Sequence, residues 1–428
     1  MKRVRLGDLA DVIVSGVDKK TKDGETHVKL CNFVDVYYNW AITDELYDSF
    51  MDASARDAEI EKFTIGKGQV AITKDSETRF DIGIPTYIAD DFEGVLLGYH
   101  CALITPNEEL LNGKYLNALL HTDYAKEYFA NNATGSGQRY TISEDTIRSF
   151  LVPLIPLEEQ KKIGDYLSDI DRKIANNRKQ NDLFEKMAKQ IYDYWFVQFD
   201  FPDENGRPYK SSGGKMVWNE QLKREIPEGW EIAKVLECIE PIERGISYSS
   251  SDIESAEGLP MLNLACFSKQ GEYRTGEMKY FSGRLNEQKK VYPYDMLIAC
   301  TDMTQGADII GRPILATEES EYFAYSMDLA KITPKNIKKM YLYYTLRTRS
   351  YHKYIKPFAS GTTVKHLNIS GVENYKLLLP TSELQVRFED LILDIKRKQM
   401  LNINIMQEGK RLRETLLPLL MTGQATIR

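Results

Sequence analysis

The chain consists of two diverged copies of one sequence unit. Residues 133–143 read ATGSGQRYTIS and residues 359–370 read ASGTTVKHLNIS, so the same loop occurs twice with one residue inserted. The match continues outside the loop, where residues 68–74 match 294–300, 103–107 match 331–336, and 114–129 match 340–355. The last pair reads as one amphipathic helix in each copy. A repeat at about half the chain length predicts two similar domains related by an internal pseudo-two-fold axis.

In each copy, short β-rich runs separated by Gly, Asp and Asn turns precede a long helix. The first helix is predicted to begin near residue 156, and no proline or glycine interrupts residues 165–201. Its seam positions follow a heptad in two interleaved series: Ile163, Ile170, Asn177, Phe184, Ile191 and Leu167, Ile174, Asn181, Ala188, Trp195. The second helix, residues 382–407, repeats the pattern with Phe388, Ile392, Ile395, Gln399, Asn402 and Met406.

A helix of about forty residues is about 60 Å long, which is too long for one domain to bury. We therefore expect the two helices to pack on each other in antiparallel orientation, with Asn177 and Asn402 facing each other or the partner helix near the middle. Gly409 and Pro418 predict that the second helix ends or bends earlier than the first. Residues 200–229 contain three prolines and four glycines and are predicted to be a linker that lies against a surface through Tyr209, Met216, Val217 and Trp218.

The bulk composition is that of a globular protein with more than one domain. The chain has 428 residues, of which 42% are apolar and 28% charged. No apolar run approaches the length of a membrane span, and aspartates interrupt the N-terminal region where a signal peptide needs an apolar core. We therefore expect a cytoplasmic protein. The five scattered cysteines and five histidines lack metal-ligand spacing, so neither a disulfide nor a metal site is expected.

The net charge of −7 is unevenly distributed along the chain. Residues 1–150 carry −9, and residues 44–61 contribute most of this excess. Between Asp328 and Glu373 there is no acidic residue, but there are seven lysines and two arginines. This basic stretch predicts a surface that faces nucleic-acid phosphates. The acidic stretch is expected to lie away from DNA, toward a partner subunit.

Sequence patterns for several catalytic sites are missing. The chain has no G-x-x-x-x-G-K-[ST] phosphate loop, no [ND]-P-P-[YF] methyltransferase pocket and no G-x-S-x-G nucleophile turn. No clustered carboxylates suggest a nuclease metal site. We therefore expect a binding protein without catalytic residues, in which the repeated loop approaches a ligand closely.

These features resemble the specificity (S) subunit of type I restriction–modification systems. The resemblance rests on PLEEQKKIGDYLSDIDRKI (156–174), on its weaker echo from Ser382, on the loop that ends Ile-Ser in each copy, and on the C-terminal LLPLLMTGQATIR. It implies an α+β fold with two pseudo-symmetric β-rich target recognition domains separated by two long antiparallel helices. The corresponding segments are residues 1–152, the spacer helix 153–199, the linker 200–229, the second domain 230–378, and the helix and tail 379–428.

The same resemblance implies partners. Each recognition domain would read one half of a bipartite, interrupted sequence in double-stranded DNA. The helices would dock two methyltransferase (M) subunits, and motor-nuclease (R) subunits would complete the complex. S-adenosylmethionine, ATP and magnesium would belong to those partners, so no cofactor is expected on this chain.

Candidate DNA-binding residues lie in the repeated loop and in the polar loops that end the matched strands. They are Lys74, Arg79, Ser136, Gln138, Arg139 and Tyr140 in the first copy and Thr301, Gln305, Thr362, Thr363, Lys365 and His366 in the second. Two other functions remain open: a stand-alone two-domain DNA-binding regulator, and a coiled-coil scaffold that reads no DNA. The basic stretch argues against the scaffold. The aromatic helix end YDYWFVQFDF (192–201) resembles a partner interface and argues against the regulator.

Overall fold

The computed structural model describes residues 2–137, 139–254, 258–268, 273–274 and 278–427. The chain divides into two compact units. Unit 1 comprises Met1–Arg178 and Ile405–Arg428, and unit 2 comprises Lys179–Asn404. Each of the two long helices, α6 (Leu157–Tyr192) and α11 (Ser382–Met421), contributes one part to each unit.

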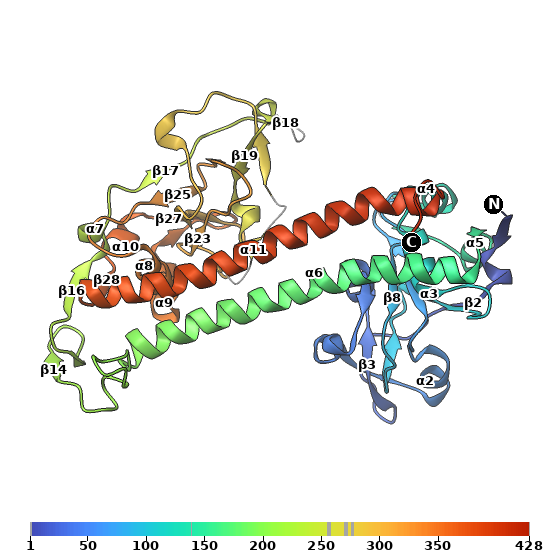
Figure 1. Ribbon diagram of the computed structural model, residues 1–428, viewed down its shortest axis with the longest axis horizontal. Coiled ribbons are helices and arrows are strands. Elements are labelled where there is room, and N and C mark those ends of the chain that lie inside the picture. Colours follow the sequence, from blue (N-terminus) through green and yellow to red (C-terminus); the bar gives the residue numbers. More distant parts are fainter. Residues whose placement is uncertain (1, 138, 255–257, 269–272, 275–277, 428) are drawn as a thin grey trace. The chain divides into compact units, whose positions relative to one another are not determined.

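Unit 1 is built on a five-stranded sheet and a smaller three-stranded sheet (Figure 1). The larger sheet has the order β2 (Ala10–Val14), β10 (Cys101–Pro106), β6 (Val70–Thr73), β8 (Pro85–Ile88), β4 (Ala41–Ile42). The smaller has the order β5 (Met51–Ala55), β3 (Thr26–Cys31), β9 (Val95–Leu97), and β1 (Lys2–Arg5) pairs separately with β13 (Leu151–Leu154). The unit's short helices are α1 (Phe33–Tyr38), α2 (Asp57–Phe63), α3 (Gly113–Leu120), α4 (Asp123–Asn132) and α5 (Glu144–Arg148).

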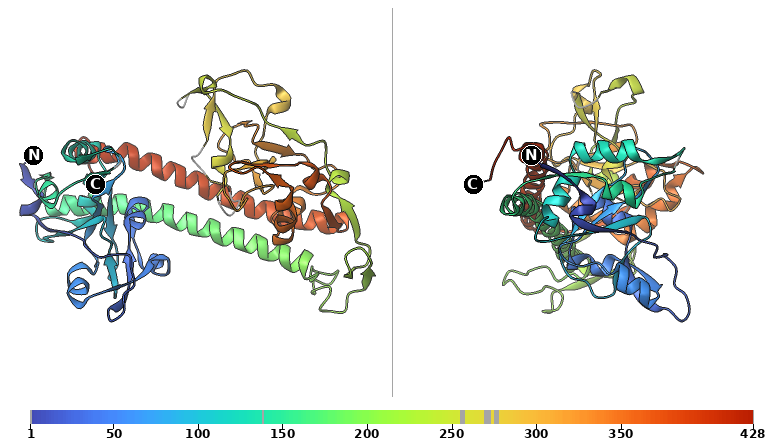
Figure 2. Two further views of the ribbon diagram at one scale, coloured as in Figure 1. Left: turned by 180° about the vertical axis from the view of Figure 1, so that it is seen from behind. Right: turned by 90° about the vertical axis from the view of Figure 1, so that its right-hand side faces the viewer.

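Unit 2 repeats this plan (Figure 2). One four-stranded sheet has the order β17 (Glu243–Arg244), β25 (Leu329–Ile332), β21 (Met296–Ala299), β23 (Pro313–Leu315). Another has the order β18 (Ile253–Glu254), β20 (Lys279–Phe281), β19 (Leu259–Leu262), β24 (Ala324–Tyr325), and β16 (Glu231–Lys234) pairs with β28 (Lys376–Leu379). The short helices are α7 (Val235–Cys238), α8 (Lys339–Thr345), α9 (Arg349–Ile355) and α10 (Ser370–Glu373).

The backbone pairing confirms the repeat. β10 pairs antiparallel with both β2 and β6, and β25 pairs antiparallel with both β17 and β21. The alignment of Ile72 with Ala102 across β6 and β10 recurs as Ile298 with Ala330. β6 and β8 in unit 1 and β21 and β23 in unit 2 are buried along their whole length, as expected for strands covered on both faces. The predicted α+β fold with two similar units is therefore confirmed.

The predicted helix that precedes the repeated loop is two helices in each unit. α3 ends at Leu120 and α4 begins after Thr122, whose side chain accepts a hydrogen bond from the Ala125 amide. In unit 2, Thr348 caps α9 in the same way by accepting from the Tyr351 amide. The expectation of one continuous helix is wrong because a threonine N-cap starts a new helix despite the continuing apolar periodicity.

The long helices run antiparallel within each unit. In unit 1, Asp171 of α6 pairs with Arg413 of α11, while Ile163 and Leu167 share a core with Leu417 and Leu420. The last turns of α11 therefore lie on unit 1, beside the α3–α4 region (Figures 1 and 2).

Unit 2 holds the other halves of the two helices. There Asn181 of α6 contacts Gln399 and Asn402 of α11, and Glu185 contacts Lys396. The predicted contact of Asn402 with the partner helix is confirmed. Asn177 is buried, and its side-chain amide donates to the carbonyl of Lys173 on its own helix.

The second helix does not end early at Gly409 or Pro418, contrary to expectation. α11 has 40 residues, and α6 has 36 residues followed directly by a π-helical turn, Asp193–Val197. Gly409 lies inside α11 where an added Cβ would come within 3.1 Å of the Ile174 side chain, so glycine permits close helix packing there. Pro418 occupies the last turn, where the missing amide removes little helical hydrogen bonding.

Most of the aromatic rings at the end of α6 belong to the core. Tyr192, Trp195, Phe196 and Phe199 are all buried in the main hydrophobic core of unit 2, where α8, α11 and Trp230 cover them. Tyr194 and Val197 of the same stretch are exposed, so a partner interface on YDYWFVQFDF stays a prediction for these side chains alone.

The linker that follows is ordered. It forms a hairpin of β14 (Met216–Asn219) and β15 (Arg224–Pro227), and Met216 and Val217 pack against the core while Trp218 is exposed. Within the described residues, no helix is both long and apolar enough to cross a membrane.

Candidate nucleic-acid interface

The repeated loop of unit 1 is a β-hairpin paired with a third strand. β11 (Thr134–Ser136) and β12 (Arg139–Thr141) form the hairpin, called hairpin 1 below. β12 also pairs with β7 (Asp75–Ser76), which places Tyr140 opposite Ser76. The amide of Ile142 extends this pairing by donating to the Lys74 carbonyl at 2.9 Å. Two loops that are far apart in sequence, 73–80 and 133–143, thus form one surface.

Unit 2 contains the same arrangement. β26 (Ala359–Ser360) and β27 (Lys365–Leu367) form hairpin 2, and β27 pairs with β22 (Thr301–Asp302). The Leu367 amide donates to the Cys300 carbonyl at 2.9 Å, as Ile142 does to Lys74. The hairpin sheet is therefore conserved between the copies in backbone, while its side chains differ.

The first glycine of each hairpin is required by the hairpin itself. Gly135 has φ +119° and Gly361 has φ +117°. A Cβ on Gly135 would lie 2.2 Å from the Arg139 carbonyl oxygen, and one on Gly361 would lie 2.0 Å from that of Val364. Close approach of a ligand is not needed to explain these two glycines. Gly137, at φ +73°, faces open space.

Gly135→Ala is expected to disrupt hairpin 1 while Gly137→Ala is tolerated. Both place alanine at positive φ, which costs roughly 1–2 kcal/mol, but only Gly135→Ala also meets backbone atoms. We expect its additional destabilisation to be about 1–3 kcal/mol. Hydrogen exchange of the Tyr140 and Ile142 amides measures it, and equal protection in the two variants would contradict this explanation.

The predicted residues of unit 1 gather on this sheet. Ser136 and Arg139 are exposed at the hairpin turn, and Tyr140 is half-buried. The Arg79 guanidinium lies 5.9 Å from the centre of the Tyr140 ring. Lys74 is more constrained because its ammonium pairs with Asp75 at 3.0 Å. Gln138 lies outside the described residues.

In unit 2, Thr362, Thr363 and His366 are exposed on hairpin 2, and Gln305 is exposed in the loop after β22. The Lys365 ammonium donates to the Gly361 carbonyl at 2.6 Å, across its own hairpin. Thr301 is only 4% exposed, so its burial contradicts a role in reading base edges. Its position in β22 directs it into the unit instead.

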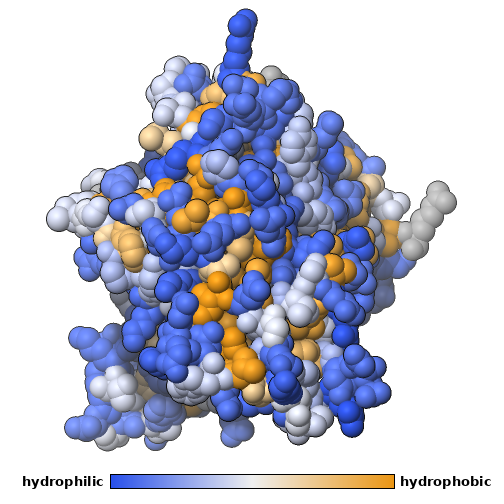
Figure 3. All heavy atoms as spheres, turned by 90° about the vertical axis from the view of Figure 1, so that its left-hand side faces the viewer, coloured by the Kyte–Doolittle hydropathy of each residue, from blue (hydrophilic) through white to orange (hydrophobic). Residues whose placement is uncertain are grey.

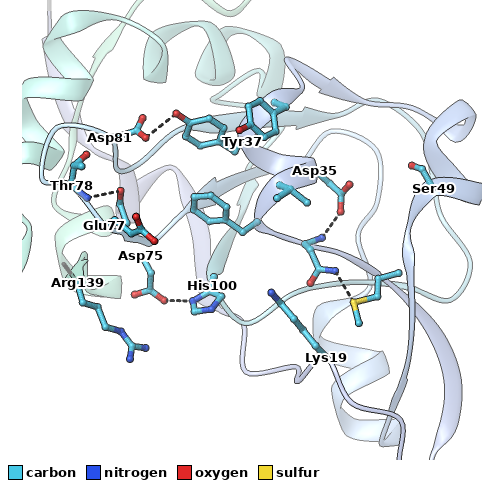
Figure 4. A pocket seen from close by; sticks show the side chains of 16 residues that line it. Lys19, Asp35, Tyr37, Ser49, Asp75, Glu77, Thr78, Asp81, His100 and Arg139 are labelled. Carbon is cyan, nitrogen blue, oxygen red and sulfur yellow. Dashed lines mark hydrogen bonds and ion pairs between the residues drawn. The ribbon is translucent and has the colours of Figure 1, made fainter. Parts of the chain in front are cut away.

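A cleft of about 790 Å³ opens beside hairpin 1 (Figure 4). Arg139 and the 75–81 loop border it on one side and α1 on the other. Its wall includes residues that the sequence interpretation missed: Lys19, Asp35, Tyr37, Tyr38, Asp81 and His100. The YY pair in FVDVYYNW was a signal, because tyrosine is enriched at interfaces, where its ring packs and its hydroxyl finds a polar partner.

Two carboxylates of the cleft are held by neighbouring side chains. Asp75 lies 2.7 Å from the His100 ring. Burial alone would raise the pKa of Asp75, but hydrogen bonds from His100, Thr141 and Lys74 outweigh it and lower the pKa. Asp81 accepts a hydrogen bond from the Tyr37 hydroxyl at 2.8 Å, which raises the pKa of Tyr37 to about 12. Tyr37 therefore remains a neutral donor at physiological pH.

The basic stretch of unit 2 is largely neutralised in the fold. Six of its nine cations pair with acidic residues outside the stretch: Lys331, Lys335, Lys338, Lys339, Arg347 and Lys356. Their partners are Glu185, Glu240, Asp295, Asp308 and Glu389. Acidic residues that are distant in sequence therefore offset much of the positive charge of this stretch, and a surface there that faces phosphates stays a prediction.

Comparisons with known proteins agree with this architecture. Residues 1–186 match the family model of the type I restriction modification DNA specificity domain. The chain is 24% identical over 330 residues to the type I restriction enzyme MjaIX specificity subunit of Methanocaldococcus jannaschii, covering 76% of this chain and 71% of that protein. It is 22% identical over 415 residues to the HindI specificity subunit of Haemophilus influenzae, covering 85% and 88%.

A solved structure shows the same fold. The crystal structure of the type I restriction–modification S subunit from M. genitalium aligns with a TM-score of 0.57 at 13% identity, covering 98% of this chain and 95% of that chain. The family model, the relatives and the duplicated fold all agree with the resemblance read from the sequence. Residues 1–186 are thus similar to the type I restriction modification DNA specificity domain, and most of the chain is similar to specificity subunits of type I restriction enzymes.

Proposed function

We propose that this chain reads an interrupted, two-part DNA sequence, with one half-site recognised by each unit. The observation that carries the proposal is the hairpin sheet, which occurs twice with the same backbone pairing and different exposed side chains. One scaffold with two sets of side chains suits two different half-sites.

The side chains of the two sheets suit different contacts. Arg139 is a donor for guanine or phosphate, and the exposed threonines and His366 of hairpin 2 offer neutral hydrogen bonds. The carboxylates beside hairpin 1, Asp81 and Glu77, are acceptors for the amino groups of cytosine or adenine. Carboxylates repel phosphates, so we infer that the cleft side of unit 1 faces base edges and that its cations contact the DNA backbone.

We also propose that α6 and α11 dock methyltransferase subunits, with motor-nuclease subunits joining in the full complex. In unit 2, α6 and the turn after it expose Leu183, Met187, Tyr194 and Val197, whose spacing places them on one face of a helix. Figure 3 views the side on which β14 and β16 lie, and apolar side chains reach the surface there among polar ones. An uncovered apolar face is typical of a protein interface. S-adenosylmethionine, ATP and magnesium would bind the partners.

A stand-alone DNA-binding regulator is the alternative to this assembly. It requires the same hairpin sheets but no partner on the helices. The exposed face of α6 favours the assembly, since a monomer gains nothing from keeping four large apolar side chains in water.

The test compares the chain alone with the chain plus its methyltransferase subunit. We expect no transfer of labelled methyl groups to mixed-sequence DNA from the chain alone, and transfer within an interrupted motif from the complex. Leu183→Lys with Met187→Lys should abolish co-purification of the two proteins, while exposed Lys186→Ala serves as the control. Methyl transfer by the lone chain, or a complex that methylates a continuous motif, would contradict the proposal.

A further inference from the structure

A cluster of three charged side chains is buried in unit 2. Glu185 of α6 contacts Lys396 of α11 at 2.6 Å and Arg347, just after α8, at 3.2 Å. The three side chains are 17%, 11% and 14% exposed, respectively. Buried charges are tolerated only when paired with good geometry. The cluster therefore fixes three elements against one another: both long helices and the recognition domain.

Aromatic rings of α8 extend the cluster. The Lys396 ammonium lies 5.4 Å and 5.6 Å from the ring centres of Tyr343 and Tyr344. Arg347 donates to the Tyr343 hydroxyl, and the Tyr344 hydroxyl donates to Glu185 at 3.4 Å. Each contact has a direction, so rotating or sliding α8 against the helices would break several at once.

The next turn of the helix pair carries a polar layer. The Asn181 amide donates to the Gln399 carbonyl at 3.0 Å, and the Gln399 amide donates back to the Asn181 carbonyl at 2.9 Å. Asn402 adds a hydrogen bond to the Asn181 side chain at 3.0 Å. Polar residues in such a seam specify register at a cost in stability.

Unit 1 has a counterpart built from different residues. Arg413 of α11 pairs with Asp171 of α6 at 3.2 Å, and its guanidinium lies 4.4 Å from the centre of the Trp40 ring. Trp40 stacks on His121 with 4.1 Å between ring centres and 7° between planes. Its backbone carbonyl accepts from Asn117 at 3.1 Å. The stack thus joins both helices to the sheet and to α3.

The two clusters differ in how far neighbouring charges counteract the effect of burial on the pKa of the carboxylate. Burial alone would raise the pKa of Glu185, but Lys396 and Arg347 lower it to about 2. Burial raises the pKa of Asp171 and outweighs the opposing effects of Arg413 and Arg178. Well-packed apolar side chains in place of Asp171 and Arg413 would stabilise the fold at least as well as the ion pair does. Stability alone therefore does not account for the ion pair.

We propose that these clusters are positioning residues, which hold each recognition domain against both helices in one axial and rotational setting and thereby restrict the complex to one gap between half-sites. The inference rests on the proposed bipartite reading. Each added base pair moves a half-site by about 3.4 Å and rotates it by about 34°. A domain that rocks on its helices would accept neighbouring gap lengths, and a domain locked by directional contacts would not.

The test replaces the charges by apolar side chains of similar length. The triple variant Glu185→Met, Arg347→Met, Lys396→Met is assembled with the methyltransferase subunit and assayed on DNA with the cognate gap and with gaps one base pair longer or shorter. We expect the preference for the cognate gap to fall at least about tenfold while the half-site letters and the melting temperature stay close to wild type. A purely structural role would move the melting temperature and leave the gap preference intact.

Three further variants keep the outcome decisive. Asp394→Asn with Arg397→Gln removes an exposed pair on α11 and should keep the wild-type gap preference. Lys396→Arg, which keeps the positive charge, should also keep the wild-type gap preference. If the triple variant does not fold, Asp171→Leu with Arg413→Met tests unit 1 in the same assay. Unchanged gap preference in the folded charge-free variants overturns this inference. Failure of the wild-type complex to methylate any interrupted motif would instead overturn the proposed function.

Discussion

Replacing Ser136 and Arg139 with alanine is expected to relax recognition of one half of the target and to leave the other half unchanged. Both side chains are exposed at the turn of hairpin 1, so their loss should not disturb the fold. Each lost base-edge contact should cost about 1–3 kcal/mol, or roughly five- to 150-fold in methylation of the cognate site. The methylated motif, read genome-wide by single-molecule sequencing, shows which letters have relaxed.

The matched variant lies on hairpin 2. Thr362→Ala with His366→Ala removes exposed side chains from the equivalent hairpin of unit 2 and should relax the opposite half-site. A residue that contacts only phosphate would instead lower binding to all sequences and reduce its salt dependence. If either variant altered both half-sites equally, the assignment of one half-site to each unit would be wrong.

The repeat and the helix seam were predictable because both leave local patterns. Matched apolar strands at a constant offset predicted that β6 and β21 would occupy equivalent places, and their pairings with β10 and β25 agree. The heptad likewise placed Asn181 and Gln399 on facing surfaces, where they exchange two hydrogen bonds. Periodicity records which face of an element is buried.

Strand pairing in the two hairpin sheets was not predictable in the same way. Residues 73–80 and 133–143 were both selected as polar loops, but nothing in either segment indicates that Tyr140 lies opposite Ser76. The pairing depends on how the intervening strands and helices fold. The cleft beside this sheet is also lined by α1. In the sequence, only the tyrosine pair of α1 indicates that this helix belongs to the site.

Charge was the least reliable guide, since ion pairs form between residues distant in sequence. Arg347 belongs to a stretch without acids, yet it lies beside Glu185, more than 150 residues earlier. The composition of the stretch predicts phosphate contacts, but it did not indicate that six of its nine cations pair with acidic side chains elsewhere in the chain. Net charge along a sequence reports on solubility and association more safely than on the location of a binding surface.

Removing one charge from the buried cluster of unit 2 is expected to have a larger effect on stability than removing all three. Glu185→Gln leaves Lys396 and Arg347 buried without a carboxylate, and breaking such a pair typically costs about 3–5 kcal/mol. The lowering of the Glu185 pKa from 4.5 to about 2 corresponds to about 3 kcal/mol. Hydrogen exchange of amides in α8 and β21 should accelerate accordingly, while amides of β6 in unit 1 serve as the internal reference.

The effect should depend on pH with a defined sign. The groups that contact Glu185 are Lys396, Arg347, Tyr344 and Gln399, and both cations keep their charge across the acidic range. Because the folded pKa of Glu185 lies below its unfolded value, its contribution is complete above about pH 5 and is lost as the pH falls toward about 2. Wild type and Glu185→Gln should therefore differ most near neutral pH and converge in acid. Asp394→Asn, which removes an exposed carboxylate from α11, should change stability by less than about 1 kcal/mol at any pH. A Glu185→Gln protein as stable as wild type at pH 7 would show that the cluster contributes no more than a surface ion pair.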